Sequence, residues 1–407
     1  MKIGVYFNAN KYSGGVYQYS LTIIEAVRSI KSTSLVIFST NHDLPESYLK
    51  DKRIKVVYID EMSKYFSYRI LGLIANTFIS QGIWLEIFER WSHLSNIRVI
   101  EDSKLDLVIY PTSSSLSYLV STPSIVAIHD LQHKLNPQFK EVSGGGQGRI
   151  REYNFARIVK YASRILVDSE IGKEDLLHCY PGADSKKIVI LPFLPPSYLK
   201  TNITILQAKK ILAKYGKFEK YFYYPANFWP HKHHLELLKA LKITHQNKLK
   251  IHLVLTGNAE VEYSTYPAFM QIAQKYHLTK YIHYLGYVDS QTISSLYRAS
   301  IGLVMPTHFG PTNIPVLEAW AMGTPVIYSG VRGCLEQLGN AGISVVPTNP
   351  NEIARAMISL VQSEQLRSKY IKRGRQRLQL WTEKDFVTRV RKMIQSSHGY
   401  PHNHSQR

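Results

Sequence analysis

Short apolar runs alternate with longer amphipathic segments along most of the 407-residue chain. The runs are rich in β-branched residues and show little polar alternation, which is typical of parallel strands buried on both faces. In the first half we expect strands at residues 3–7, 35–39, 55–59, 105–110, 125–129 and 165–168, and helices at 17–30 and 149–162.

A proline-rich stretch at residues 191–196 interrupts this pattern, because proline cannot donate to a sheet and restricts the residue before it. Beyond it the alternation restarts. We expect strands at 221–224, 251–256, 282–285, 302–305, 325–328 and 344–346, and helices at 235–245, 267–277, 292–298 and 315–322. Two such arrays predict an α/β protein with two doubly wound Rossmann-like domains facing across a cleft, at residues 1–195 and 196–380.

The charge balance constrains the partners. The formal net charge is +20, which predicts an anionic partner: a nucleic acid, an acidic membrane face or a phosphorylated small molecule. A nucleic acid is set aside, because the chain has no zinc-finger spacing, RRM-type aromatic motif or concentrated basic helix. Cys179 and Cys334 have no C-x-x-C spacing, which favours a reducing cytoplasm over a disulfide framework. No apolar run reaches the length of a membrane span.

Residues 65–94 form the most apolar long stretch, but charged residues interrupt it and predict amphipathic helices. Its aromatic side chains are candidates for contact with an anionic membrane or an acceptor, and core packing is the other interpretation. They are Tyr68, Phe78, Trp84, Phe88 and Trp91.

Two loops in the first half carry candidate chemistry. Gly14 and Gly15 stand where the helix at 17–30 must begin, so the backbone there can approach a phosphate or sugar closely. An ordinary tight turn is the other interpretation. His129 and Asp130 lie at a strand end, where open α/β sheets bind ligands. A capping role for Asp130 and a purely structural one for His129 remain open.

In the second half, Lys232 lies near the start of a predicted helix, where a cation opposes the helix dipole. A bound phosphate would relieve that conflict. Neighbouring His231, His233 and His234 invite a metal interpretation, but no matching carboxylate or cysteine set accompanies them. We therefore expect no metal.

The strongest signal is a turn at residues 310–313 that leads into the helix at 315–322. Such a turn directs backbone amides at a diphosphate. Glu318, one turn further, can accept hydrogen bonds from ribose hydroxyls, as acids do in other nucleotide folds. A glutamate on the helix surface is the other interpretation.

These segments resemble retaining glycosyltransferases of the GT-B fold, in family 4 (group 1 glycosyltransferases). Residues 314–326 match the family's donor-binding pattern almost position by position. The step around Tyr287 is also similar to the family, where it holds the base through backbone contacts. Gly-Pro-Thr-Asn stands at residues 310–313, in place of the first glutamate of the family's E-x7-E pattern, and indicates a subgroup.

The resemblance implies a role for each candidate. His129 would contact the donor sugar near the anomeric centre, Lys232 would pair with the diphosphate, and Glu318 would hold the ribose; we treat these as the catalytic candidates. The implied donor-binding set is Gly14, Gly15, Asn227, Lys232, Tyr287, Gly310, Thr312, Asn313, Ile314 and Glu318. In it the two first-half glycines approach the diphosphate, and the amides of Asn313 and Ile314 contact phosphate or sugar oxygens.

Two positions depart from the family pattern. Gly310 lacks the carboxylate that normally touches donor-sugar hydroxyls, and Asn227 replaces the usual arginine five residues before Lys232. The resemblance also implies that a helix at 381–395 packs back toward the first domain, and we expect a disordered tail at 396–407.

The resemblance implies transfer of a hexosyl, for example mannosyl, residue from a nucleotide-diphosphate sugar to a saccharide or lipid-linked saccharide in cell-surface polysaccharide synthesis. The chain has no D-x-D sequence, and preorganised cations and amides can stabilise the leaving phosphate, so we expect no cofactor. Two closely spaced catalytic carboxylates are not evident, which favours front-face attack by the acceptor. A same-fold sugar-nucleotide epimerase and a non-catalytic binder of a nucleotide sugar or anionic polymer are the alternatives.

Overall fold

The computed structural model describes residues 1–12, 14–60, 89–200, 202–216, 220–310 and 312–397. It divides into two compact units. Unit 1 comprises Met1–Gln138, Val142–Pro192 and Glu383–Arg407, and unit 2 comprises Phe139–Glu141 and Phe193–Thr382.

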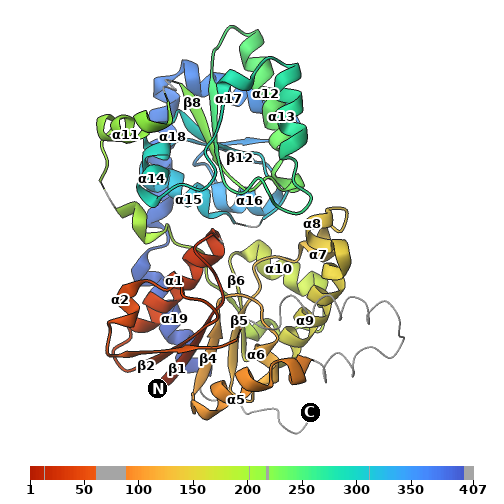
Figure 1. Cartoon of the computed structure of the whole chain (residues 1–407), viewed down its shortest axis with the longest axis vertical. Coiled ribbons are helices and arrows are strands. Elements are labelled where there is room, and N and C mark those ends of the chain that lie inside the picture. Colours follow the sequence, from red (N-terminus) through yellow and green to blue (C-terminus); the bar gives the residue numbers. More distant parts are fainter. Residues whose placement is uncertain (13, 61–88, 201, 217–219, 311, 398–407) are drawn as a thin grey trace. The chain divides into compact units, whose positions relative to one another are not determined.

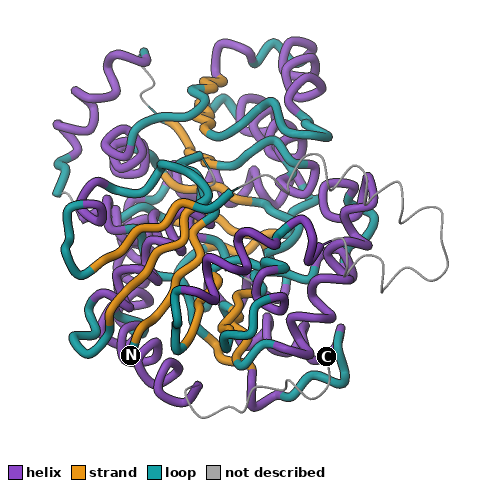
Figure 2. The backbone as a smooth tube through the Cα atoms, turned by 60° about the horizontal axis from the view of Figure 1, so that its bottom comes forward, coloured by secondary structure: helices purple, strands orange, loops and turns teal. Residues whose placement is uncertain are grey.

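Unit 1 is built on a seven-stranded sheet in the order β3-β2-β1-β4-β5-β6-β7, with every neighbouring pair parallel. Helices accompany the strands (Figure 1), and Figure 2 shows the strands side by side. The strands are β1 (Lys2–Phe7), β2 (Ser34–Ser39), β3 (Ile54–Tyr58), β4 (Leu107–Tyr110), β5 (Ser124–Ala127), β6 (Arg164–Val167) and β7 (Ile188–Ile190).

Helices of the first part of the chain lie between these strands in the sequence, and α19 belongs to the last segment of the chain. They are α1 (Gly15–Arg28), α2 (Glu46–Leu49), α5 (Leu94–Asp102), α6 (Leu116–Leu119), α7 (Gln132–Leu135), α8 (Lys140–Ser143), α9 (Gln147–Tyr161), α10 (Glu170–Cys179) and α19 (Glu383–Ser397), with short 3-10 turns η1 (Gly144–Gly146) and η2 (Ser185–Lys187).

Unit 2 has a six-stranded parallel sheet in the order β10-β9-β8-β11-β12-β13. Its strands are β8 (Tyr221–Pro225), β9 (His252–Thr256), β10 (Ile282–Tyr284), β11 (Gly302–Met305), β12 (Val326–Ser329) and β13 (Ile343–Val345). Its helices are α11 (Ile205–Leu212), α12 (His234–Gln246), α13 (Tyr266–Lys275), α14 (Ser290–Ala299), α15 (Ile314–Met322), α16 (Arg332–Leu338), α17 (Pro350–Gln362) and α18 (Glu364–Gln379), with 3-10 turns η3 (Ser197–Lys200), η4 (Ala213–Tyr215), η5 (Pro230–Lys232) and η6 (Thr279–Tyr281).

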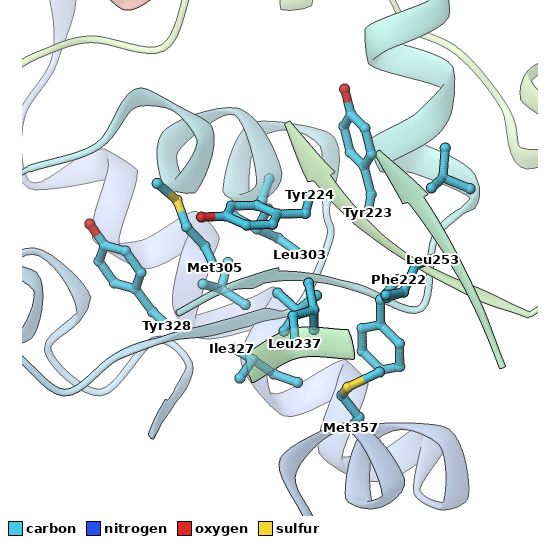
Figure 3. Packing of buried hydrophobic residues seen from close by; sticks show 14 of the residues in the cluster. Phe222, Tyr223, Tyr224, Leu237, Leu253, Leu303, Met305, Ile327, Tyr328 and Met357 are labelled. Atoms are coloured by element: carbon cyan, nitrogen blue, oxygen red, sulfur yellow. The ribbon is translucent and has the colours of Figure 1, made fainter. Parts of the chain in front are cut away.

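Aromatic residues of β8 organise the core of unit 2. Phe222 lies close to Met357 of α17, whereas Tyr223 points away from that helix, because side chains alternate along a strand (Figure 3). The tyrosines stay buried without leaving their hydroxyls unpaired: the hydroxyl of Tyr223 is 2.8 Å from Thr256 Oγ1, and that of Tyr224 donates to the Lys232 carbonyl at 2.9 Å. The core of the sheet thus holds the loops that follow its strands.

The prediction of two doubly wound α/β arrays is confirmed. Every expected strand is present, with ends within two residues of the prediction. Strand β7 and helices α2, α5, α6, α7, α8, α10, α11 and α16 were not among the expected elements. Strand β7 is three residues long and adjoins the proline-rich stretch, so its apolar run gives little signal.

Candidate functional site

In unit 2 the strand order reverses between β8 and β11, because the strands after β8 extend one way and those after β11 the other. Ligands of open α/β sheets bind beyond the strand ends at such a switch point. Several contacts join the loops that follow these strands. The His308 N–H donates to the His231 carbonyl at 2.7 Å, and Lys232 Nζ lies 3.4 Å from Thr307 Oγ1.

Lys232 is the last residue of η5, just before helix α12. Its carbonyl is held by the Tyr224 hydroxyl, so the core of the sheet fixes the backbone at this point. The positive end of the α12 dipole lies in the same segment. Lys232 thus stands just before a helix, as the sequence predicted, and a cation beside helix amides suits a phosphate ligand.

The turn before α15 favours glycine at position 310, where the family pattern has a glutamate. Gly310 has a φ of +115°, and a Cβ on it would lie 2.9 Å from Asn313 Nδ2. The Asn313 side chain occupies that space because Nδ2 donates to the Tyr328 hydroxyl at 2.6 Å. A glutamate at this position would therefore be strained and would also collide with its neighbour.

Gln337 completes this turn and was not singled out in the sequence. Its Oε1 accepts from the Asn313 N–H at 2.9 Å, and its Nε2 donates to the Asn313 carbonyl at 2.9 Å. The resemblance assigned the Asn313 amide to a phosphate or sugar oxygen, whereas here it donates to Gln337. Ile314 is the first residue of α15, and Thr312 lies in the turn before it.

Glu318 is buried in the second turn of α15, so the interpretation as a surface glutamate is wrong. Its Oε1 accepts from the Tyr198 hydroxyl at 2.6 Å and its Oε2 from the Tyr297 hydroxyl at 2.7 Å. Burial raises the pKa of Glu318, and the two tyrosine donors oppose that rise. A carboxylate offers about four lone-pair sites, so each oxygen keeps capacity for one more hydroxyl.

Asn227, in the loop after β8, and Tyr287, in the loop after β10, lie at the same end of the sheet. Asn227 Oδ1 accepts from the Asn258 N–H at 2.8 Å, so this side chain braces the loops after β8 and β9. Tyr287 follows β10 and is 48% exposed. The structure thus gives Asn227 a bracing contact in the place of the family's arginine.

In unit 1 the strand order reverses between β1 and β4. Gly14 caps α1 with a φ of +57°, and no heavy atom lies within 4 Å of where its Cβ would be. Gly15 is the first residue of the helix. Across the switch point, the Thr112 hydroxyl donates to Asn8 Oδ1 at 2.9 Å. The glycine loop therefore has the open backbone that close approach of a ligand requires.

His129 follows β5 and reaches the end of β4. Its Nε2 lies 2.8 Å from the Pro111 carbonyl, which can only accept, so the ring proton sits on Nε2 and Nδ1 is the acceptor. Burial lowers the pKa of His129, which keeps the ring neutral near pH 7. Asp130 accepts from Arg151 at 2.6 Å and from the Gln132 N–H at 3.0 Å, so it holds the first N–H of α7, although Leu131 is the N-cap of that helix.

Within the described ranges, no group of three or more His, Cys, Asp or Glu side chains is placed to hold a metal ion. None of the helices described is both long and apolar enough to cross a bilayer. The aromatic stretch expected at residues 65–94 lies mostly outside the described residues, as do Pro311 and most of the expected tail. Trp91, at its described end, is 72% exposed.

Residues 207–377, which lie within unit 2, match the family model for glycosyl transferases group 1. O-antigen chain mannosyltransferase B of Escherichia coli is 25% identical over 253 residues, which cover 62% of this chain and 64% of the relative, slightly less than two thirds. O-antigen chain mannosyltransferase RfbU of Salmonella typhimurium is 22% identical over 356 residues, covering 86% of this chain and 88% of the relative.

Among solved structures, Anabaena HepE in complex with UDP and glucose has a TM-score of 0.73 at 16% identity. The match covers 98% of this chain and 100% of that one. This likeness shows the fold, which is the GT-B fold that the sequence predicted.

Proposed function

We propose that this chain is a glycosyltransferase that transfers a sugar from a nucleotide-diphosphate donor to a saccharide acceptor in polysaccharide synthesis. The observation that carries the proposal is the junction of two loops at the β8/β11 switch point, where Lys232 stands beside Thr307. The group 1 family match and the two relatives named as O-antigen mannosyltransferases support it.

Each group in the site has a chemical task in this proposal. Negative charge grows on the departing diphosphate, and Lys232 with the neighbouring helix amides offers fixed positive charge there. Glu318 accepts from ribose hydroxyls with its remaining lone pairs. The resemblance gives His129, which is neutral and held by the Pro111 carbonyl, a contact with the donor sugar.

The finer parts of the proposal rest on the resemblance. The donor sugar is a hexose such as mannose, the reaction retains configuration, and the acceptor attacks from the front face while the leaving phosphate helps to remove its proton. The acceptor is a saccharide or a lipid-linked saccharide, reached from the cytoplasmic side with peripheral contact to an anionic membrane. No metal or other cofactor takes part.

Donor binding tests the site. Calorimetry of UDP-glucose and GDP-mannose should show binding of at least one, weakened about tenfold or more by Lys232→Ala, because one or two charge-assisted hydrogen bonds are lost. Glu318→Gln should weaken it similarly, and it should fold because the amide oxygen can still accept from a tyrosine. Lys275→Ala, an exposed lysine on α13, is the matched control. Unchanged affinity in both site variants would remove these residues from the donor site.

Product analysis tests the reaction itself. Release of nucleotide that depends on an added saccharide acceptor supports transfer. Conversion of the donor without an acceptor supports a sugar-nucleotide epimerase. Donor binding with no turnover on any acceptor supports a non-catalytic binder, the alternative that Gly310 motivates.

A further inference from the structure

Three titratable side chains stand in a row beside Lys232. Glu236 Oε2 lies 3.2 Å from His233 Nδ1, and His233 Nε2 lies 3.4 Å from His308 Nδ1. The side chains of His233 and Glu236 are largely buried, with 13% and 20% exposed. His233 has a φ of +52°, which is uncommon outside glycine and is typical of functional sites. We call Glu236, His233 and His308 the histidine row.

The backbone holds the row at the junction of the two loops. His308 follows Thr307, the contact of Lys232 Nζ, and its own N–H donates to the His231 carbonyl. Glu236 lies in the first turn of α12, where the helix dipole favours a negative charge. The row therefore connects the start of α12 to the loop after β11, with Lys232 next to it in the chain.

The Glu236 carboxylate at one end of the histidine row determines which nitrogen donates and which accepts along it. The hydrogen bond from His233 lowers the pKa of Glu236, so this carboxylate is ionised and can only accept. His233 then carries its proton on Nδ1 and accepts with Nε2, which places the proton between the two rings on His308 Nδ1. That leaves His308 Nε2 as the nitrogen that can take up a further proton.

We propose that His308 takes up one proton when the diphosphate of the donor binds at Lys232, and then donates an N–H to a phosphate oxygen. In this assignment His308 is a ligand-binding residue, and His233 and Glu236 are positioning residues that stabilise its positive charge. The proton comes from solvent and no covalent bond is formed or broken. The inference rests on the proposed donor site.

In the absence of a ligand, burial and the neighbouring positive charge favour the neutral form of His308. Burial lowers the pKa of His308, and the neighbouring His233 lowers it further. Lys232 Nζ lies beside Thr307, the residue before His308, and Lys239 donates to Glu236 Oε1 at 3.3 Å. A bound diphosphate supplies the opposite charge and reverses this balance.

Other histidines of the segment are less suited to the role. His231 faces Glu141 at 2.9 Å instead of His308. His234 is buried between the rings of Phe228 and Tyr224, and burial lowers its pKa to about 3, so it stays neutral. The Phe139 ring that contacts His308 carries no charge.

The experiment measures proton uptake during binding. UDP-glucose and GDP-mannose suit it, because their diphosphates are diesters without a phosphate titration near neutral pH. Calorimetry of the full chain in buffers of different ionisation enthalpy should show uptake of up to about one proton, and affinity should rise by up to about tenfold per pH unit as pH falls from about 8 to about 6. His308→Gln should abolish both the proton uptake and the pH dependence of the affinity.

Matched variants separate the parts of the proposal. Glu236→Gln should reduce the uptake, and His178→Gln, an exposed histidine of α10, should not change it. Binding without proton uptake, or with uptake retained in His308→Gln, overturns this inference and leaves the proposed function standing. Uptake retained in Glu236→Gln overturns the positioning roles. No binding of either sugar nucleotide by the native chain overturns both proposals.

A second measurement covers variants that fail to fold. Histidine ring signals of the native chain, followed by NMR across pH, should show the pKa of His308 rising when UDP-glucose or GDP-mannose is added. A pKa of His308 that stays unchanged in the saturated protein contradicts the inference.

Discussion

Glu318 and Gly310 show how single residues at this site depend on partners elsewhere in the chain. The sequence identified both positions, but it gave no sign that Tyr198 and Tyr297 would hold the carboxylate. Nor did it show that Asn313 would fill the space beside the glycine. The two tyrosines come from other helices, and a tyrosine at helical spacing looks like any core residue before the fold is known. Asn313 belongs to the same turn as Gly310, but the direction of its side chain depends on Tyr328 of β12.

Gly310 should not tolerate a side chain. Gly310→Ala should lower the free energy of unfolding by about 1–3 kcal/mol, because a φ of +115° is strained for an L-residue and the new Cβ would press on Asn313. Gly310→Glu, which restores the carboxylate of the family pattern, should lose at least as much. Urea denaturation measures both.

Gly182→Ala is the control for this prediction, because Gly182 has no heavy atom within 4 Å of its Cβ position and no positive φ. It should change the stability by less than about 0.5 kcal/mol. A Gly310→Ala variant as stable as this control would show that the turn does not require glycine.

Helix α15 shows which features of a single helix follow from the local sequence and which depend on its packing partner. Its ends follow local signals: Asn313 is the N-cap, a proline stands in the first turn, and Gly323 ends the helix with a φ of +71°. The sequence therefore predicted it to within one residue. Its packing partner was not predictable, because contact with α18 depends on Trp320 lying against Gly374, which is far away in the sequence.

Gly374→Ala should destabilise the protein although alanine is the better helix former. A Cβ at residue 374 would lie 2.3 Å from Trp320 Cδ1, so α15 and α18 would have to separate. We expect a loss of about 1–3 kcal/mol from this overpacking, which exceeds the gain of about 1 kcal/mol in helix propensity. Thermal unfolding measures the change.

Ser368→Ala, at an exposed position of the same helix, serves as the comparison. It should be neutral or slightly stabilising, because it gains propensity without meeting another side chain. Equal effects of the two substitutions would mean that α18 does not depend on a glycine at the Trp320 contact.

At the scale of the whole molecule, unit 1 contains both the first and the last described segments of the chain. Helix α19 contacts α1 (Figure 1), and its Phe386, Val390, Met393 and Ile394 are buried. Arg389 donates to the Ile190 carbonyl at 2.8 Å. The stability of unit 1 therefore depends on residues that follow the whole of unit 2.

Phe386→Ala should lower the stability of unit 1 by about 3–5 kcal/mol, because it leaves a cavity at a fully buried position. Hydrogen exchange should show the loss of protection in strands such as β1, with β8 unchanged. Lys392→Ala, exposed on the same helix, should leave both strands protected. Equal loss in β1 and β8 for Phe386→Ala would mean that the units do not unfold separately.

The sequence alone determined all strands except β7, the helices with a clear amphipathic period, and the two doubly wound arrays, because these follow from local periodicity. It also determined which loops carry Lys232, Glu318 and His129, because parallel sheets bind ligands at their strand ends. Only the tertiary structure decided which side chains meet there. The Glu318–tyrosine contacts, the Asn313–Gln337 pair and the histidine row join residues from separate elements. Hydrogen bonds act over about 3 Å, so such contacts exist only after distant segments are brought together.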